Sequence, residues 1–130
     1  IARERVTFET GDAMDLRANL GEFDVVLAAN LLCRLTDPRR FLDRLPSLVK
    51  PGGQLLLATP FTWLEEFTPR ETWLGGRHPE DARSWDTLRA LLEPHFEFQI
   101  AKELPFLIRE HARKFQYGIA LGSRWRRRPE

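Results

Sequence analysis

The sequence predicts an α/β domain with a mostly parallel sheet and an antiparallel C-terminal strand. Phe23 to Ala29 is a nearly continuous apolar segment rich in valine, which indicates a strand buried on both faces of a parallel sheet. A helical segment and a second apolar strand, Gln54 to Thr59, follow it and complete a βαβ unit. Phe96 to Ile100 and Tyr117 to Leu121 also have strand character with no helix between them, which favours antiparallel pairing.

The chain before this unit is expected to begin with a strand. Val6 to Glu9 alternates apolar and polar residues, which is typical of a half-buried strand. The following segment, Thr10 to Leu16, contains Gly11 and Asp12, which indicate a turn.

The two helices are assigned from their start and stop signals. Asp37 is expected as the N-cap of the first helix, and Lys50 to Gly53 ends it with a turn. Ser84 is expected to cap the second helix, which ends before Pro94. Leu104 to His111 is expected to be an irregular connection between the two closing strands.

The composition indicates a single domain over residues 1–130, because 42% hydrophobic residues supply enough material for one core. The formal net charge of +1 gives no general attraction to nucleic acid, and Arg124 to Arg128 is interpreted as a solvated basic tail. No apolar run approaches the roughly 20 residues of a membrane span, and the N-terminus lacks a signal-peptide core. We therefore expect a cytoplasmic protein with no membrane contact.

No metal site is expected. Cys33 is the single cysteine, and His78, His95 and His111 show no ligand spacing with it. Cys33 is interpreted as a small buried hydrophobic residue.

The segment from Pro60 to Gly76 is the strongest candidate for a functional loop. It contains two tryptophans, two phenylalanines, several carboxylates and an arginine, and it begins at the carboxyl end of an expected strand. Ligands bind at that end of the strands in open α/β sheets. Long loops that carry such residues are usually functional.

These motifs resemble a class I S-adenosylmethionine-dependent methyltransferase. The resemblance rests on Gly11-Asp12-Ala13 after a strand, Asn30 after the next strand, the Lys50-Pro51-Gly52-Gly53 turn and the antiparallel end. It implies a partial Rossmann-like methyltransferase fold, because the first strand and the glycine-rich cofactor loop of that superfamily are not found. The sequence therefore resembles an N-terminally truncated domain in which Phe23 to Ala29 becomes an edge strand.

A narrower resemblance comes from the long loop and a second block. Residues 62–70 and 73–76, together with 104–110 and 113–116, resemble the methyltransferase domain of ovothiol synthase, the 4-mercaptohistidine N1-methyltransferase family. This resemblance implies S-adenosylmethionine as the cofactor, thiohistidine as the substrate and a fused or separate sulfoxide synthase module as a partner.

The resemblance also implies the residues of the cofactor site. Asp12 and Ala13 would lie beside the adenine, Met14 would pack on the ring, and Asn30 and Leu31 would border the sulfonium. Without the resemblance, Gly11-Asp12 is a common turn sequence. Asn30 can then be a strand cap, and Leu31 a residue of the core.

An amino acid with an imidazole ring needs an anion for its amine, a cation for its carboxylate and an aromatic wall for its ring, and the candidates for the substrate site supply these groups. They are Trp63, Glu65, Glu66, Arg70, Trp73 and Arg109. Glu66 and Arg70 are equally well explained as an ion pair on one helical turn, and Arg109 as part of a solvated charged face.

The expected reaction is attack by an imidazole nitrogen on the sulfonium methyl. Glu65 or Glu66 would accept the other ring N–H and so select the reactive tautomer. No general base is assigned. The alternatives are a methyltransferase with another small-molecule acceptor and an inactive fragment.

Overall fold

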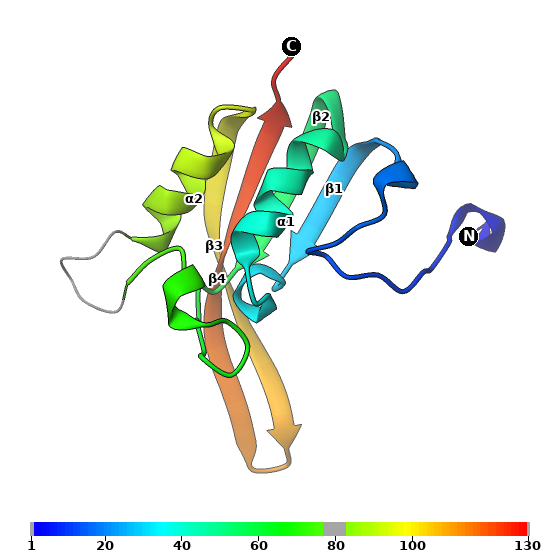
Figure 1. Cartoon of the computed structure of the whole chain (residues 1–130). Helices are drawn as coiled ribbons and strands as arrows, with labels where there is room; N and C mark the ends of the chain where they lie inside the picture. Colours follow the sequence, from blue (N-terminus) through cyan, green and yellow to red (C-terminus); the bar gives the residue numbers. More distant parts are fainter. Residues whose placement is uncertain (1, 77–82, 130) are drawn as a thin grey trace.

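The computed structural model describes residues 2–76 and 83–129, so His78 lies outside the described residues. Its strands are β1 (Phe23–Ala29), β2 (Val49–Thr59), β3 (Phe96–His111) and β4 (Lys114–Arg127), which form one sheet in the order β1-β2-β4-β3 (Figure 1). β1 and β2 are parallel, whereas β4 is antiparallel to both β2 and β3. The predicted α/β class with an antiparallel end is confirmed, and parallel pairing within the described residues is confined to β1 and β2.

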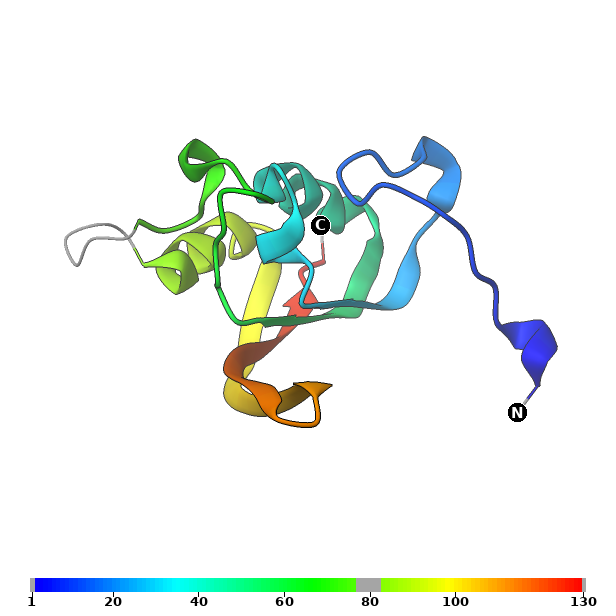
Figure 2. The ribbon, with the colours of Figure 1, turned by 90° about the horizontal axis from the view of Figure 1, so that it is seen from below.

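Two helices, α1 (Pro38–Arg44) and α2 (Ser84–Leu92), cover the same face of this sheet (Figure 2). Asp37 caps α1 as predicted, since its carboxylate accepts a hydrogen bond from the Arg39 amide at 3.2 Å. α1 is shorter than predicted because Pro46 has no N–H to donate to the Leu42 carbonyl. Short 3-10 helices complete the chain: η1 (Arg3–Arg5), η2 (Ala18–Leu20), η3 (Leu32–Arg34), η4 (Leu45–Ser47) and η5 (Arg70–Thr72).

Ser84 does not cap α2, which corrects the prediction. Arg83 occupies the N-cap position without a side-chain hydrogen bond, and Ser84 is the first helical residue. The Ser84 hydroxyl instead accepts a hydrogen bond from the Trp63 indole at 2.9 Å. The Ser84 hydroxyl, which the sequence predicts as a helix cap, therefore binds Trp63 of the long loop instead.

The core lies between the sheet and the two helices and is centred on Trp125, which is fully buried. The rings of Phe98 and Trp85 pack on it with centroids at 5.2 and 5.9 Å. The predicted basic tail is therefore wrong, because Arg124 to Arg127 belongs to β4. Strand alternation turns Trp125 and Arg127 inward, and Arg127 donates to the Pro46 carbonyl at 3.1 Å.

The predicted strand from Val6 to Glu9 is not formed. These residues are extended without sheet pairing, and Val6 and Phe8 are 51% and 92% exposed. An alternating pattern makes a strand only where a neighbouring strand can accept its hydrogen bonds, and the described residues supply none beside it. β1 lies at the edge of the sheet, as predicted.

The predicted irregular connection from Leu104 to His111 is part of β3. The β3–β4 hairpin is paired from Phe96 and Arg127 to His111 and Lys114, and its far end projects beyond the rest of the sheet (Figure 1). Pro105 misled the prediction, yet it is tolerated because β3 is an edge strand.

The face of the sheet opposite the helices is uncovered by any described residue (Figure 2). Val25 and Leu27 of β1 are 52% and 66% exposed, and Ile100 of β3 is 53% exposed. A shallow apolar groove crosses this face between Leu27 and Leu104.

Candidate functional site

The candidate site lies where β1 and β2 end side by side. Asn30 follows β1 and donates its amide to the Ala58 carbonyl of β2 at 2.7 Å. Asn30 and Phe61 have φ values of +54° and +52°, a left-handed conformation that is uncommon for residues with a side chain. Such conformations are frequent at functional sites, which makes both strand ends candidates for a functional role.

A cavity of about 260 Å³ opens at these strand ends. Three parts of the chain line it: the strand ends, the 3-10 helix η3 and the projecting hairpin. The residues that contribute polar, charged or aromatic groups are Asn30, Cys33, Arg34, Thr62, Phe106, Gln116 and Tyr117. The cavity lining therefore combines neutral hydrogen-bonding groups, one arginine and aromatic residues.

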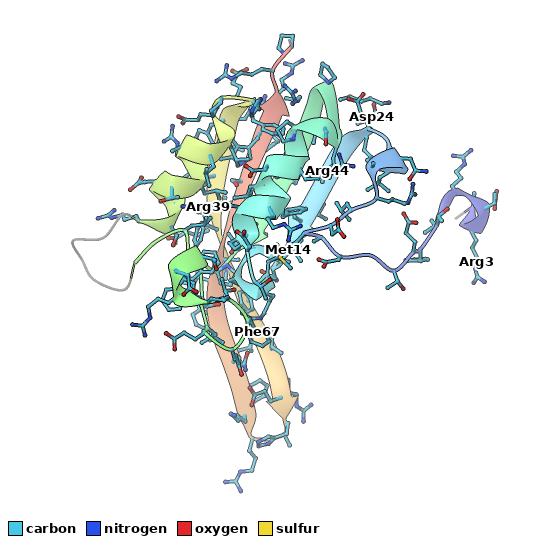
Figure 3. The ribbon with its side chains drawn as sticks, in the orientation of Figure 1. Arg3, Met14, Asp24, Arg39, Arg44 and Phe67 are labelled. Atoms are coloured by element: carbon cyan, nitrogen blue, oxygen red, sulfur yellow. The ribbon has the colours of Figure 1, made fainter. Side chains whose placement is uncertain are left out.

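Cys33 and Arg34 form one wall of this cavity. Cys33 is buried, as predicted, with its Sγ 3.9 Å from the Thr62 hydroxyl. Arg34 donates from Nη1 to the Cys33 carbonyl at 3.2 Å, and its guanidinium lies 4.8 Å from the centroid of the Phe67 ring. Figure 3 labels Phe67, which lies in the long loop.

The long loop, residues 60–76, is held by buried contacts. Thr68 is fully buried, and its hydroxyl donates to the Leu35 carbonyl at 2.6 Å. The Trp73 indole donates to the Thr68 carbonyl at 2.8 Å, and only 9% of Trp73 is exposed. Trp63 is half-buried and is tied to Ser84.

Trp63 and Trp73, the tryptophans predicted to contact the substrate, therefore have structural partners, and neither of them lines the cavity. The charged candidates of the loop also lie outside it. Arg70 pairs with Glu65 at 2.7 Å rather than with Glu66, and both partners are more than half exposed. The expected Glu66–Arg70 pair is therefore corrected to Glu65–Arg70.

Arg109 lies on the hairpin beyond the cavity. It is exposed and pairs in register with Phe115, one step past the cavity-lining pair Ile108 and Gln116. Its Nε donates to the His111 carbonyl at 3.4 Å.

The cofactor candidates of the first turn lie beside a second hollow of about 360 Å³. Asp12 accepts a hydrogen bond from the Met14 amide at 2.9 Å, and Ala13 lines the hollow. The Met14 sulfur lies 3.2 Å from the Thr36 hydroxyl and 3.3 Å from the Asp37 amide, which fastens this turn beside the start of α1 (Figure 3). Leu31 is half-buried and packs against the core.

This turn fits the adenine end of S-adenosylmethionine. Asp12 is exposed and uses only Oδ1 within the turn, which leaves Oδ2 as an acceptor for an exocyclic amine. Ala13 and Met14 supply apolar contact beside it. The described residues contain no glycine-rich turn after a strand that would hold the methionine end, so they fit one part of the cofactor.

Sequence reasoning missed most of the cavity wall. Cys33 and Arg34 follow Asn30 closely, so the reasoning that placed Asn30 at a strand end could also have placed these two residues near the site. Phe106 and Gln116 belong to the second block of the resemblance, but no pattern assigns them or Tyr117 to a site, because their place depends on the second half of β3, which the sequence predicts as an irregular connection. Among the described residues, no group of three His, Cys, Asp or Glu side chains is arranged to hold a metal ion. No described helix is long and apolar enough to cross a bilayer.

The βαβ unit, the sheet order and the cavity at the strand ends together define a Rossmann-like methyltransferase fold. The chain belongs to the methyltransferase domain family, whose sequence model matches residues 2–109.

Solved structures of the same fold support this assignment. A SAM-dependent methyltransferase from Methanosarcina mazei is 19% identical with a TM-score of 0.65, and 95% of this chain covers 68% of that one. The N-methyltransferase NodS from Bradyrhizobium japonicum, solved with S-adenosyl-L-homocysteine, is 18% identical with a TM-score of 0.58, and 98% of this chain covers 58% of it. The [4+2]-cyclase SpnF is also 18% identical with a TM-score of 0.58, and 99% of this chain covers 61% of it.

The chain thus spans less than two thirds of the length of NodS and SpnF. At 18–19% sequence identity, the likeness to these structures shows a shared fold and no more. Because a methyltransferase and a cyclase share that fold, the reaction has to be argued from the site.

Proposed function

We propose that this chain is part of an S-adenosylmethionine-dependent methyltransferase that methylates an imidazole nitrogen of thiohistidine. The observation that carries the proposal is the small cavity at the ends of β1 and β2, which lies where this fold binds its ligands. The family assignment supports methyl transfer. The choice of thiohistidine rests on the sequence resemblance of the long loop and of the hairpin.

The chain's residues would hold the two ligands at different places. Asp12, Ala13 and Met14 would hold the adenine, and Asn30 and Leu31 would border the reacting end. When bound, S-adenosylmethionine supplies a methyl group on a positively charged sulfur. The acceptor would occupy the cavity between Asn30 and the hairpin.

Inside the cavity, the residues have to select the reactive form of the ring. An imidazole nitrogen is nucleophilic when its lone pair is free, so the proton must reside on the other nitrogen. The amides of Asn30 and Gln116 and the Thr62 hydroxyl are neutral acceptors for that N–H. Glu65 and Glu66, which were expected in this role, are not among the residues that line the cavity.

The Phe106 ring, which is half-buried and lies over Gly118, supplies a wall for a flat ring. It would help keep the acceptor nitrogen in line with the methyl group and exclude water from it. A sulfur nucleophile on the same substrate would be excluded by position, because only the ring nitrogen would face the strand ends.

The test is a methyl-transfer assay with this chain, S-adenosylmethionine carrying a labelled methyl group, and thiohistidine or histidine as the acceptor. We expect label on thiohistidine at a ring nitrogen by mass spectrometry, and at least a tenfold lower rate for Asn30→Ala. Arg39→Ala on the outside of α1 is the matched control, and its rate should be unchanged.

Two results would contradict the proposal in different ways. Label on another acceptor but not on thiohistidine would refute the substrate and retain methyl transfer. No calorimetric binding of S-adenosylmethionine to a chain that circular dichroism shows to be folded would refute methyl transfer by this chain. The partner expected from the resemblance, a sulfoxide synthase module, remains a proposal.

A further inference from the structure

We propose that Arg34 makes this cavity a receptor for a small molecule that carries a carboxylate. The inference deepens the proposed function, because it names the chemical group through which the acceptor is recognised. It also assigns the carboxylate-binding role to a residue other than Arg70, the cation expected from the sequence.

The first argument is the charge of the cavity wall. Among the described residues that line it, Arg34 is the one with a formal charge at neutral pH. Its neighbours in the wall are amides, hydroxyls, a thiol and apolar groups. Among the described lining residues, a ligand that enters this cavity meets one cation and no carboxylate, so the cavity favours an anion.

The second argument is the way the guanidinium is held. The Nη1 atom donates to the Cys33 carbonyl at 3.2 Å and lies 3.6 Å from the Cys33 sulfur. The Phe67 ring, with its centroid 4.8 Å away, supports the planar group. These contacts orient the side chain at one end without neutralising it.

The third argument is the set of donors that remains. No carboxylate among the described residues forms an ion pair with Arg34, and its Nε and Nη2 atoms have no described partner. Those two donors form the edge of a guanidinium that binds a carboxylate with two parallel hydrogen bonds. Arg70, in contrast, already uses its Nε for Glu65 at 2.7 Å.

The volume of the cavity agrees with an amino acid as the ligand. The cavity of about 260 Å³ is smaller than the roughly 300–1,000 Å³ of sites for drug-sized molecules. A carboxylate at Arg34 would direct the rest of an amino acid toward Phe106, the aromatic side chain of the hairpin that is half-buried.

The experiment is calorimetric titration of the chain without cofactor. The probes are thiohistidine and its decarboxylated amine, which differ only in the carboxylate, and histidine with histamine as a second pair. We expect the wild type to bind each amino acid at least tenfold more tightly than its amine. Arg34→Ala should remove that preference while leaving the affinity for the amines within about twofold.

Two further variants separate recognition from structure. Arg34→Gln keeps a donor for the Cys33 carbonyl without the charge, and it should also lose the preference. Arg39→Ala, which removes an exposed arginine outside the cavity, should keep it. Circular dichroism should show that all variants are folded.

Equal affinity of the wild type for acid and amine, or a preference that survives in Arg34→Ala, would overturn the inference. Absence of binding of both amino acids to the folded wild type would overturn it as well. If the Arg34-dependent preference is found but no methyl reaches thiohistidine, the proposed reaction fails and the carboxylate site stands.

Discussion

Thr68 shows how one side chain fixes the functional loop to the rest of the protein. It is fully buried, and its hydroxyl donates to the Leu35 carbonyl at 2.6 Å, just before α1 begins. Its own carbonyl accepts the Trp73 indole at 2.8 Å. The first bond ties the loop that carries Phe67 to the segment before α1, and the second holds the loop's own conformation beside the wall formed by Cys33 and Arg34.

We expect Thr68→Val to reduce the free energy of unfolding by about 1–3 kcal/mol, because it leaves a buried carbonyl without its donor at nearly constant volume. Chemical denaturation measures this change. Thr68→Ser, which keeps the hydroxyl, is the matched control and should lose less than Thr68→Val. Equal stability of Thr68→Val and the wild type would show that the Leu35 carbonyl does not depend on this bond.

At this scale the sequence was informative only for local contacts. Asp37 was predicted as an N-cap because its partner is the amide two residues further along the chain. The contact of Arg34 with Phe67 joins distant parts of the chain, and no local pattern indicates it. Arg70 had two glutamates within reach, and sequence spacing chose the wrong one.

The turn from Lys50 to Gly53 acts as an element of its own inside β2. Phe23 pairs with Val49 and Val25 pairs with Gln54, so Asp24 alone faces the four residues of the turn. A Cβ on Gly53 would lie 2.8 Å from the Asp24 carbonyl oxygen and 2.9 Å from the Lys50 carbonyl oxygen. Gly52 has a φ of +77° and open space around it.

Alanine at these two glycines should therefore have different effects. We expect Gly52→Ala to cost about 1–2 kcal/mol of stability, from the left-handed backbone alone. Gly53→Ala should cost more, because backbone atoms have to move out of the way of the new Cβ. Thermal and denaturant unfolding of both variants test this order, and a Gly53→Ala protein as stable as Gly52→Ala would contradict it.

The strands and helices were predicted well where each has its own local sequence signal. The βαβ unit was recovered because its strands, cap and turn each have a separate sequence signal. Val6 to Glu9 has the same alternation, but burial and hydrogen bonding are missing there, and both are properties of neighbours. The cavity was only half predicted, since its second side comes from the hairpin.

The whole molecule exposes more surface than its size requires. Its accessible surface is 9162 Å², whereas a folded monomer of its mass is expected to expose about 7,100 Å². The N-terminal segment, the uncovered face of the sheet and the projecting hairpin carry many of the exposed large apolar side chains. Apolar side chains on that face therefore contribute little to the core.

The two faces of the sheet should respond differently to truncation of leucine. Leu27→Ala, at a residue that is 66% exposed, should change the free energy of unfolding by about 0.5 kcal/mol or less. Leu57→Ala, at a residue that is 2% exposed beneath the helices, should cost about 2–5 kcal/mol. Equilibrium unfolding measures both changes. A large loss for Leu27→Ala would show that this face is covered in solution.

The position of β1 at the edge of the sheet has a further consequence for amide hydrogen exchange. Within the described parts of the chain, β1 is bonded on one side only, so alternate amides between Phe23 and Ala29 point to solvent while the others are held by β2. In heavy water the strand should exchange as two interleaved sets of amides, one fast and one protected. A chain segment or another molecule that paired with β1 would slow the fast set alone, which makes these amides a reporter of edge occupation.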